Sequence, residues 1–167
     1  MMTLRDIVHG TTVLIDASVL LYARNRRSPQ CRELLTRCEQ GAVNGVITLS
    51  TLEEFSHRCL VQEAVGNGLA AVNPVRKLAA DPKLVCQLNA YADSVRDLLD
   101  CSLVVAESHA QDFHVALELQ KQHGLLIHNA LNLAVARRHS IKDIAIVGPA
   151  FDQVPGLILY KPEEIAP

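Results

Sequence analysis

Short apolar runs alternate along the chain with segments in which apolar residues recur every three or four positions. Runs of this length are typical of strands that are buried on both faces of a sheet. They occupy residues 13–15, 45–47, 102–105, 144–147 and 157–160. Because helical patterns separate them, we predict an α/β fold in which about five strands form a mostly parallel sheet covered on both faces.

The segments between these runs carry signals for helices. Ser28 followed by Pro29 is typical of a helix start, because serine caps the first turn and proline suits the first helical position. The residues that follow place several apolar side chains on one face of that helix: Cys31, Leu34, Leu35, Cys38 and Ala42. Further helices are predicted at residues 17–23, 52–60, 108–124 and 129–139.

The middle of the chain has a different pattern. Gly66-Asn67-Gly68 indicates a turn, and residues 74–80 are predicted to be helical. A longer helix is predicted after Asp81-Pro82, because its apolar residues alternate spacings of four and three, as in an antiparallel helix pair. These residues are Leu84, Leu88, Tyr91, Val95 and Leu98. We therefore predict a single domain, residues 1–167, within which about residues 63–100 form a helical arm or lid.

The amino-acid composition mainly excludes classes of protein. With 49% hydrophobic and 20% charged residues, the 167-residue chain does not fit disorder or low complexity. Sixteen basic against eighteen acidic residues give a net charge of −2, so a nucleic acid would have to be held by a local patch. Arg24, Arg26 and Arg27 are the candidates for such a patch, although charge runs of this kind are more often solvated faces.

Neither a membrane nor a secretory context is predicted. No uncharged stretch reaches the ~20 apolar residues that a membrane span requires, and acidic Asp6 precedes any run that could form a signal peptide. The five cysteines are scattered and lack a C-x-x-C motif, which disfavours a disulfide framework or a cysteine-based zinc site. We expect a soluble cytoplasmic protein with no membrane partner.

Polar residues follow several of the predicted strands. Asp16 comes directly after the first strand, and Glu54, with Glu53 beside it, lies in the first turn of the helix after the second. Asn129 opens the last long helix, and Asp152 follows the fourth strand. Ligands of open α/β sheets bind outside the carboxyl ends of the strands, so these side chains can converge. Oxygen ligands suit Mg²⁺ or Mn²⁺, which activate water for phosphodiester hydrolysis.

Four segments resemble, in order and spacing, the motifs of the PIN domain, the ribonuclease fold used by VapC-type toxins. The segments are residues 13–22, 48–58, 125–134 and 144–152. The resemblance implies a three-layer α/β/α fold, with Asp16 and Glu54 as ligands of Mg²⁺ or Mn²⁺. The first motif normally carries a small polar residue two positions after its Asp, and Ser18 matches it. We assign Ser18, together with the three arginines, to nucleic-acid binding.

The departures from the PIN pattern concern charge. Asn129 stands where the third motif normally has an Asp, and Gly148 and Ala150 stand where the fourth normally has acids. An asparagine can offer a carbonyl oxygen but no negative charge, whereas a divalent ion taken from water needs anionic ligands. We therefore expect weak metal binding and weak or absent nuclease activity.

Two functions follow from the resemblance. In the first, a PIN-like protein with weakened or lost catalysis acts by binding RNA or an antitoxin-like protein, and we expect a homodimer. In the alternative, an active Mg²⁺- or Mn²⁺-dependent ribonuclease holds its ion with Asp16 and Glu54. Asn129 would then orient water, and Asp152 or Glu53 would serve as a shifted auxiliary acid. An aspartate-nucleophile phosphatase is disfavoured, because it needs a second Asp two residues after the first.

Each candidate residue also has a purely structural interpretation. Asp16 can cap the helix that follows it, and Glu54 can interact with a helix dipole. Asn129 occupies a position near a helix start, where asparagine is common. Ser18 has no recognisable histidine–aspartate pair, so a structural role is favoured over that of a nucleophile.

Overall fold

A parallel sheet organises the computed structural model of the chain, which describes residues 2–165. Within that range the sheet has six strands in the order β1-β6-β5-β2-β3-β4, and every neighbouring pair is parallel. The strands are β1 (Met2–Thr3), β2 (Thr12–Ile15), β3 (Asn44–Thr48), β4 (Val104–Ala106), β5 (Asp143–Ala145) and β6 (Ile158–Lys161).

The five predicted strands are confirmed, and β1 is an addition. β1 has only two residues and pairs with β6 at the edge of the sheet, so it carries no apolar run that a sequence pattern could detect. β2 lies between β5 and β3 in the interior of the sheet. Its residues Val13, Leu14 and Ile15 are each at most 1% exposed. The α/β class and the parallel pairing are therefore as predicted.

Contacts divide the chain into two units. Unit 1 comprises residues 1–52 and 102–167 and contains the sheet, and unit 2 comprises residues 53–101. From the sequence we expected the helical arm to begin at about residue 63, whereas unit 2 begins at Glu53, inside a helix. That helix, α3 (Leu49–Gly66), has its first four residues in unit 1.

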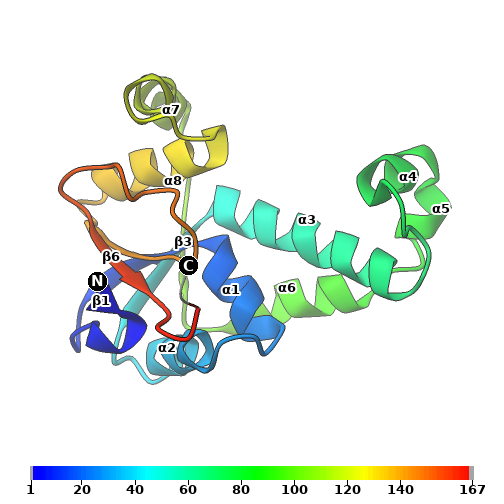
Figure 1. Cartoon of the computed structure of the whole chain (residues 1–167), viewed down its shortest axis with the longest axis horizontal. Coiled ribbons are helices and arrows are strands. Elements are labelled where there is room, and N and C mark those ends of the chain that lie inside the picture. The colour runs from blue at the N-terminus through cyan, green and yellow to red at the C-terminus, as the bar shows by residue number, and fades with distance from the viewer. Residues whose placement is uncertain (1, 166–167) are drawn as a thin grey trace. The chain divides into compact units, whose positions relative to one another are not determined.

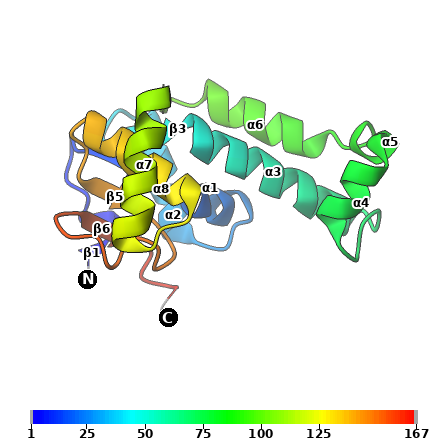
Figure 2. The same cartoon turned by 90° about the horizontal axis from the view of Figure 1, so that it is seen from above.

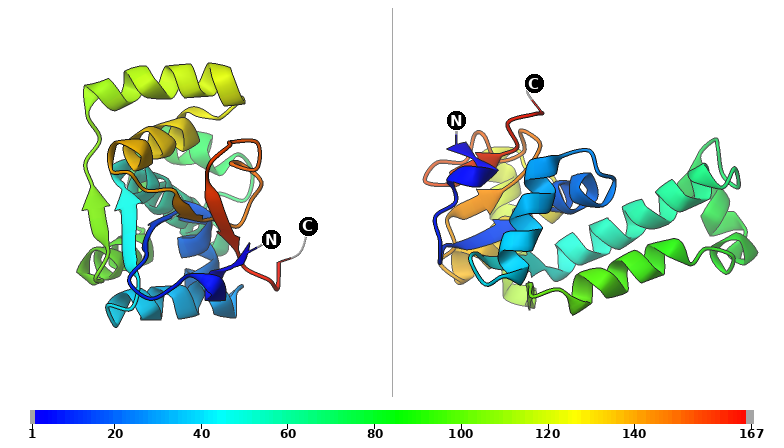
Figure 3. Two further views of the ribbon diagram at one scale, coloured as in Figure 1. Left: turned by 90° about the vertical axis from the view of Figure 1, so that its left-hand side faces the viewer. Right: turned by 90° about the horizontal axis from the view of Figure 1, so that it is seen from below.

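Helices cover both faces of the sheet in unit 1. They are α1 (Ala17–Arg24), α2 (Pro29–Glu39), α7 (Ala110–His123) and α8 (Ile127–Arg138), with a short 3₁₀ helix, η1 (Leu4–Asp6). Figure 3 (left) shows α8 and α7 on one side of the sheet and α2 on the other. Ser28 caps α2 as predicted, because its hydroxyl accepts a hydrogen bond of 3.0 Å from the Cys31 N–H. This is the expected three-layer α/β/α arrangement.

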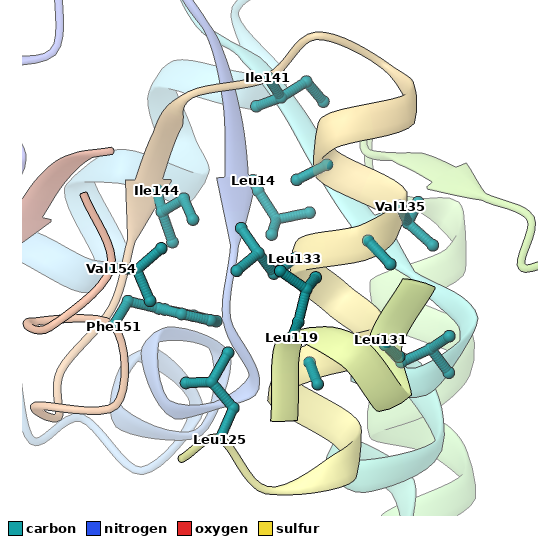
Figure 4. Packing of buried hydrophobic residues seen from close by; sticks show 14 of the residues in the cluster. Leu14, Leu119, Leu125, Leu131, Leu133, Val135, Ile141, Ile144, Phe151 and Val154 are labelled. Atoms are coloured by element: carbon teal, nitrogen blue, oxygen red, sulfur yellow. The ribbon is translucent and has the colours of Figure 1, made fainter. Parts of the chain in front are cut away.

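The largest hydrophobic core lies between the sheet and α8. Figure 4 shows Leu14 of β2, Ile144 of β5, Leu133 of α8 and Phe151 pointing toward one another. All four are at most 1% exposed. Every residue of α8 from Asn129 to Ala136 is buried, because α7 covers the side of α8 that faces away from the sheet. A helix buried all round loses the one-sided polar face by which sequence patterns recognise surface helices.

An ion pair joins the two helices of this layer. The guanidinium group of Arg138 donates hydrogen bonds to both carboxylate oxygens of Asp112, at 2.9 and 3.1 Å, and to the Glu107 carbonyl. Asp112 also accepts the His109 N–H, and His109 is the N-cap of α7, whereas the sequence predicted the cap at Ser108. Burial raises the pKa of Asp112, but these hydrogen bonds outweigh it and hold the pKa below its ordinary value.

Unit 2 is a helical hairpin. Figures 1 and 2 show α3 and α6 (Ala90–Asp100) side by side, with α4 (Pro74–Ala80) and α5 (Pro82–Val85) at the end of the pair. The turn at residues 66–68 is as predicted, with Gly68 at a φ of +71°. The unit has its own small core of Ala64, Ala70, Leu78 and Leu88, against which Leu60, Leu84 and Tyr91 pack.

The predicted helix from residue 84 to residue 98 is wrong, because the chain leaves the helical path at residues 86–89. The carboxylate of Glu63 accepts hydrogen bonds from the backbone N–H groups of Asn89, Ala90 and Tyr91, at 2.8–3.1 Å. These are N–H groups at the start of α6, which have no partner within the helix. The Glu63 side chain of α3 therefore caps the start of a new helix, α6, at a point where the apolar spacing predicted one continuous helix.

Gly45 generates a stability prediction. A Cβ added at this β3 residue would lie 2.5 Å from Leu103 Cδ2 and 2.8 Å from Cys38 Sγ, so α2 approaches the sheet closely only because the side chain is absent. We expect Gly45→Ala to lower the free energy of unfolding by about 1–3 kcal/mol through overpacking. Urea unfolding followed by circular dichroism measures the change.

Gly148→Ala is the matched control for this measurement. A Cβ at Gly148 meets no atom within 4 Å, and its backbone is not in the left-handed region. We expect its unfolding midpoint to equal that of the unmodified chain within error. Equal midpoints for both variants would contradict the close packing of α2 on β3.

Candidate functional site

The carboxyl ends of β5, β2 and β3 share one edge of the sheet, because the three strands are neighbours and parallel. Asp16 lies at this edge, directly after β2, and its N–H donates a 3.0 Å hydrogen bond to the Ala145 carbonyl of β5. The residue is 8% exposed and is the N-cap of α1. The structural interpretation of Asp16 as a helix cap is thus realised, at the position that the resemblance to the PIN domain assigns to a metal ligand.

Ser18 holds this carboxylate. Asp16 Oδ2 accepts hydrogen bonds from the Ser18 N–H at 2.9 Å and from the Ser18 hydroxyl at 2.5 Å. The Ser18 oxygen accepts a further hydrogen bond of 3.1 Å from the Val147 N–H, just beyond β5. One serine therefore fixes the orientation of Asp16 and joins the ends of two strands.

A second polar cluster begins at the end of β3. The Thr48 hydroxyl donates a 2.5 Å hydrogen bond to Asn132 Oδ1 of α8, and the Thr51 N–H donates to Thr48 Oγ1 at 3.0 Å. Thr48 and Thr51 are fully buried and Asn132 is 1% exposed. Such a cluster is stable only because its polar groups find partners. It anchors the helix that carries Asn129.

Asn129, the third residue of α8, is 9% exposed. Asn129 and Asn132 are three residues apart and therefore lie on the same face of the helix. This spacing is visible in the sequence, but the resemblance to the third PIN motif points only to Asn129 as a site residue. Thr48 and Asn132 were missed because only the fold shows that a strand end and a helix meet there.

Glu54, the second expected metal ligand, belongs to unit 2. Its carboxylate pairs with Arg58 one turn along α3, with an N–O distance of 3.2 Å. Neighbouring Glu53 is exposed. A partly exposed pair within one helix contributes little to stability, but it gives the Glu54 carboxylate a cation partner within its own helix.

Asp152, proposed as an auxiliary acid, has a basic partner. Lys161 Nζ of β6 lies 2.6 Å from Asp152 Oδ1. The Asp152 side chain is 40% exposed. At the fourth-motif positions, Gly148 and Ala150 supply no side-chain oxygen. The negative charge of Asp152 is therefore balanced by a lysine from the neighbouring strand.

The three arginines lie at the end of α1 and in the loop that leads to α2. Arg26 and Arg27 are exposed, and Arg24 is half-buried. Arg26 adopts a left-handed conformation with a φ of 54°, and the Arg27 guanidinium lies 5.1 Å from the centre of the Tyr22 ring. The loop therefore presents concentrated positive charge with one cation held against an aromatic ring.

The residues of the edge do not fit a Mg²⁺ or Mn²⁺ centre. Within residues 2–165, no group of three or more His, Cys, Asp or Glu side chains is arranged to hold an ion. In unit 1 the expected set supplies the Asp16 carboxylate, which Ser18 already engages, the Asp152 carboxylate, which is paired with Lys161, and the neutral amide of Asn129. Divalent ions of this type favour several anionic oxygens. No catalytic step through a metal follows from these side chains.

Ser18→Ala tests the structural role of the serine. Removing the hydroxyl deprives Asp16 of one hydrogen bond and leaves the Val147 N–H without its acceptor, so we expect the free energy of unfolding to fall by about 1–2 kcal/mol. Urea unfolding measures it. The control is Ser50→Ala, which removes a half-buried hydroxyl that has no hydrogen bond among the described residues. An unchanged midpoint for Ser18→Ala would exclude the bridging role.

Sequence comparison identifies no relative: no family model matches the chain, and no curated protein matches it. In the described part of the chain, no helix combines the length and apolar character needed to cross a bilayer.

Three solved structures are similar to this chain in fold. VapBC2 from Rickettsia felis, bound to a DNA fragment from its promoter, has a TM-score of 0.60 and 15% identity, over 91% of this chain and 99% of that one. A toxin–antitoxin complex from Klebsiella pneumoniae has a TM-score of 0.56 and 16% identity, over 87% and 95% of the two chains. VapC20 from Mycobacterium tuberculosis, a Sarcin-Ricin loop cleaving toxin, has a TM-score of 0.56 and 12% identity, over 86% and 95%.

These similarities cover nearly the whole of each chain, whereas the identities are too low to carry an activity from one protein to another. The parallel sheet and the three layers (Figure 3) agree with the fold that the resemblance of the four motifs implies. The chain has the PIN-like fold of VapC-type toxins.

Proposed function

We propose that this protein is a PIN-like module of the toxin–antitoxin type that acts by binding and has lost metal-dependent RNA cleavage. The observation that carries the proposal is the low free negative charge at the carboxyl ends of the strands. Asp16 is engaged by Ser18, Asn129 is neutral, and Asp152 is paired with Lys161. A metal nuclease holds its Mg²⁺ through carboxylates together with waters and substrate phosphates, and here the carboxylates of Asp16 and Asp152 already have partners.

RNA is the ligand that the charged surface supports best. Arg24, Arg26 and Arg27 concentrate three cations in four residues, and the stretch from residue 17 to residue 32 contains no acid. Phosphate contacts of this kind supply affinity without requiring cleavage. Ser18 lies at the opposite end of α1 from Arg24, so in this proposal it supports the edge and the arginines contact the RNA backbone.

An antitoxin-like protein is a second candidate partner. It is supported by the structural neighbours, of which one is a toxin–antitoxin complex and another is a VapBC2 assembly. The two partners differ in their salt dependence, because counterion release makes phosphate contacts steeply sensitive to ionic strength. The salt dependence of RNA binding therefore distinguishes the two partners.

Titration with Mn²⁺ tests the loss of metal binding. A bound ion stabilises the folded state by mass action, and at tenfold excess over Kd the gain is about 1.4 kcal/mol, or roughly 3–5 °C in Tm. We expect the unmodified chain to show no such rise at millimolar Mn²⁺. Differential scanning fluorimetry measures it, and a rise of that size would overturn the proposal.

Restoring the acids provides the positive control. Asn129→Asp keeps the size of the side chain, and Gly148→Asp enters open space, because a Cβ there meets no atom within 4 Å. We expect the double variant to gain the Mn²⁺-dependent rise in Tm, and Asp16→Asn added to it to remove the rise. A double variant that folds but ignores Mn²⁺ would show that residues 144–152 do not correspond to the fourth PIN motif.

A salt series tests the arginine loop. Each phosphate contact on single-stranded nucleic acid contributes about −0.7 to the slope of log K against log salt. We expect Arg26→Ala with Arg27→Ala to make the slope shallower by about 1.4, as measured by fluorescence anisotropy with a labelled single-stranded RNA between 50 and 300 mM salt (roughly the range in which screening changes most).

Lys121→Ala with Arg137→Ala is the matched control, because it removes the same charge from exposed positions on α7 and α8. Its slope should equal that of the unmodified chain. If the loop variant and the control have equal slopes, the arginines do not contact phosphate. If the unmodified chain does not bind RNA at the lowest salt, the antitoxin-like protein becomes the favoured partner.

A further inference from the structure

The residues that follow β6, 162–165, lie against the start of α2; we call them the strap. Figure 3 (right) shows the red segment after β6 reaching this end of α2. The Glu164 carboxylate accepts hydrogen bonds from the Ser28 hydroxyl at 2.5 Å and from the Gln30 N–H at 3.0 Å. The side chain of Gln30 donates to the Glu163 carboxylate and accepts the Glu163 N–H, each at 3.3 Å. These contacts cover Ser28 and Gln30, which are 0% and 4% exposed.

The strap brings two negative charges to the start of α2. Within residues 2–165, neither Glu163 nor Glu164 forms a salt bridge with a basic side chain. Burial raises the pKa of Glu164, but hydrogen bonds from Ser28 and Gln30 outweigh it and hold the pKa below its ordinary value. The Glu164 carboxylate is therefore ionised at neutral pH, and hydrogen bonds rather than a contacting cation hold it in place.

The arginine loop, residues 24–27, ends where the strap is attached. Arg27 directly precedes Ser28, whose hydroxyl donates to Glu164. Consecutive Cα atoms are about 3.8 Å apart, whereas exposed charges interact over roughly 8–10 Å at physiological salt. The Glu164 carboxylate therefore lies within electrostatic range of the Arg27 backbone. Two negative charges of the strap oppose the three positive charges of the loop.

Helix α2 does not need the strap in order to form. The Ser28 oxygen accepts the Cys31 N–H at 3.0 Å, and it caps the helix whether or not the hydroxyl proton is donated to Glu164. The Gln30 N–H belongs to the first turn, where backbone donors have no partner within the helix and water can replace a carboxylate. Glu163 and Glu164 are exposed. The strap can therefore detach and leave α2 intact.

We infer that the strap is an autoinhibitory contact: in the closed position seen in this structure it weakens RNA binding by the arginine loop, and RNA binds the open form. The inference rests on the proposed RNA-binding function. The two acids of the strap repel a phosphate backbone that approaches Arg26 and Arg27. Glu164 also occupies the Ser28 hydroxyl and the Gln30 N–H, which are donors that a phosphate oxygen can use. An RNA that binds the open form more tightly shifts the chain toward it.

Gln30→Ala tests the strap without any change in charge. The substitution removes both side-chain hydrogen bonds to Glu163 and keeps every acid and every arginine. We expect the Kd for a labelled single-stranded RNA to fall about threefold or more, because a site that is open for a larger fraction of the time has a proportionally lower apparent Kd. Fluorescence anisotropy measures the Kd. Gln122→Ala, at an exposed position of α7, is the matched control and should leave it unchanged.

Glu164→Ala removes the contact together with one negative charge. We expect it to lower the Kd for the same RNA by about tenfold, because it both opens the strap and reduces repulsion. Glu118→Ala is the matched control, since it removes the same charge from an exposed position on α7, on the other side of the sheet from α2 (Figure 3, left). In a chain that also carries Arg26→Ala and Arg27→Ala, Glu164→Ala should have no larger effect than Glu118→Ala.

Hydrogen exchange reports on the strap in the absence of RNA. The backbone N–H of Gln30 is bonded to Glu164 in the closed form, so we expect it to exchange about tenfold faster in Glu164→Ala than in the unmodified chain. Exchange at the same residue should not change in Glu118→Ala. Mass spectrometry of a peptide that covers the start of α2 measures the rates, and circular dichroism melts verify that each variant folds.

The outcomes separate the inference from the function on which it rests. If the unmodified chain binds RNA and the strap variants bind it no more tightly than their controls, the inference is overturned and the proposed function stands. Unchanged exchange at Gln30 in Glu164→Ala also overturns the inference, because the strap then does not protect the start of α2. If no protein of the series binds RNA at the lowest salt, the proposed RNA-binding function fails and the inference fails with it.

Discussion

The burial of β2 on both faces is the constraint on which the rest of unit 1 depends. Val13, Leu14 and Ile15 are at most 1% exposed, so helices must cover the sheet on either side. On one side the core of α8 closes over Leu14, and on the other α2 approaches closely because Gly45 has no side chain. The first polar residue after this strand, Asp16, is consequently fixed at the carboxyl edge and oriented by Ser18.

The edge of the sheet illustrates why the placement of charge matters more than its total. The near-neutral net charge of −2 neither favours nor excludes a metal nuclease. The positions at which the resemblance implies acids hold Asn129 and Gly148, and Asp152 has a lysine partner. These observations support the proposal that a PIN-like fold here serves binding rather than hydrolysis, since fold alone does not set function.

Most of the fold was predictable because its signals are local. Five apolar runs became five strands, and Ser28-Pro29 became the start of α2. The predictions that failed depend on contacts between distant residues. Glu63 accepts hydrogen bonds from the start of α6 and so interrupts the helix predicted from residue 84. Thr48 at the end of β3 donates a hydrogen bond to Asn132 of α8. Neither contact leaves a periodic signal, because each joins residues 26–84 positions apart.

The sequence by itself determined the α/β class and the parallel sheet, because alternation of apolar runs and helical stripes follows from burial alone. Only the tertiary structure decided which polar side chains meet at the carboxyl edge of the sheet and what they contact. It paired Asp152 with Lys161, bound Asp16 to Ser18, and divided the chain into two units at Glu53. Such partnerships depend on distances of about 3 Å between side chains, which the order of residues along the chain does not specify.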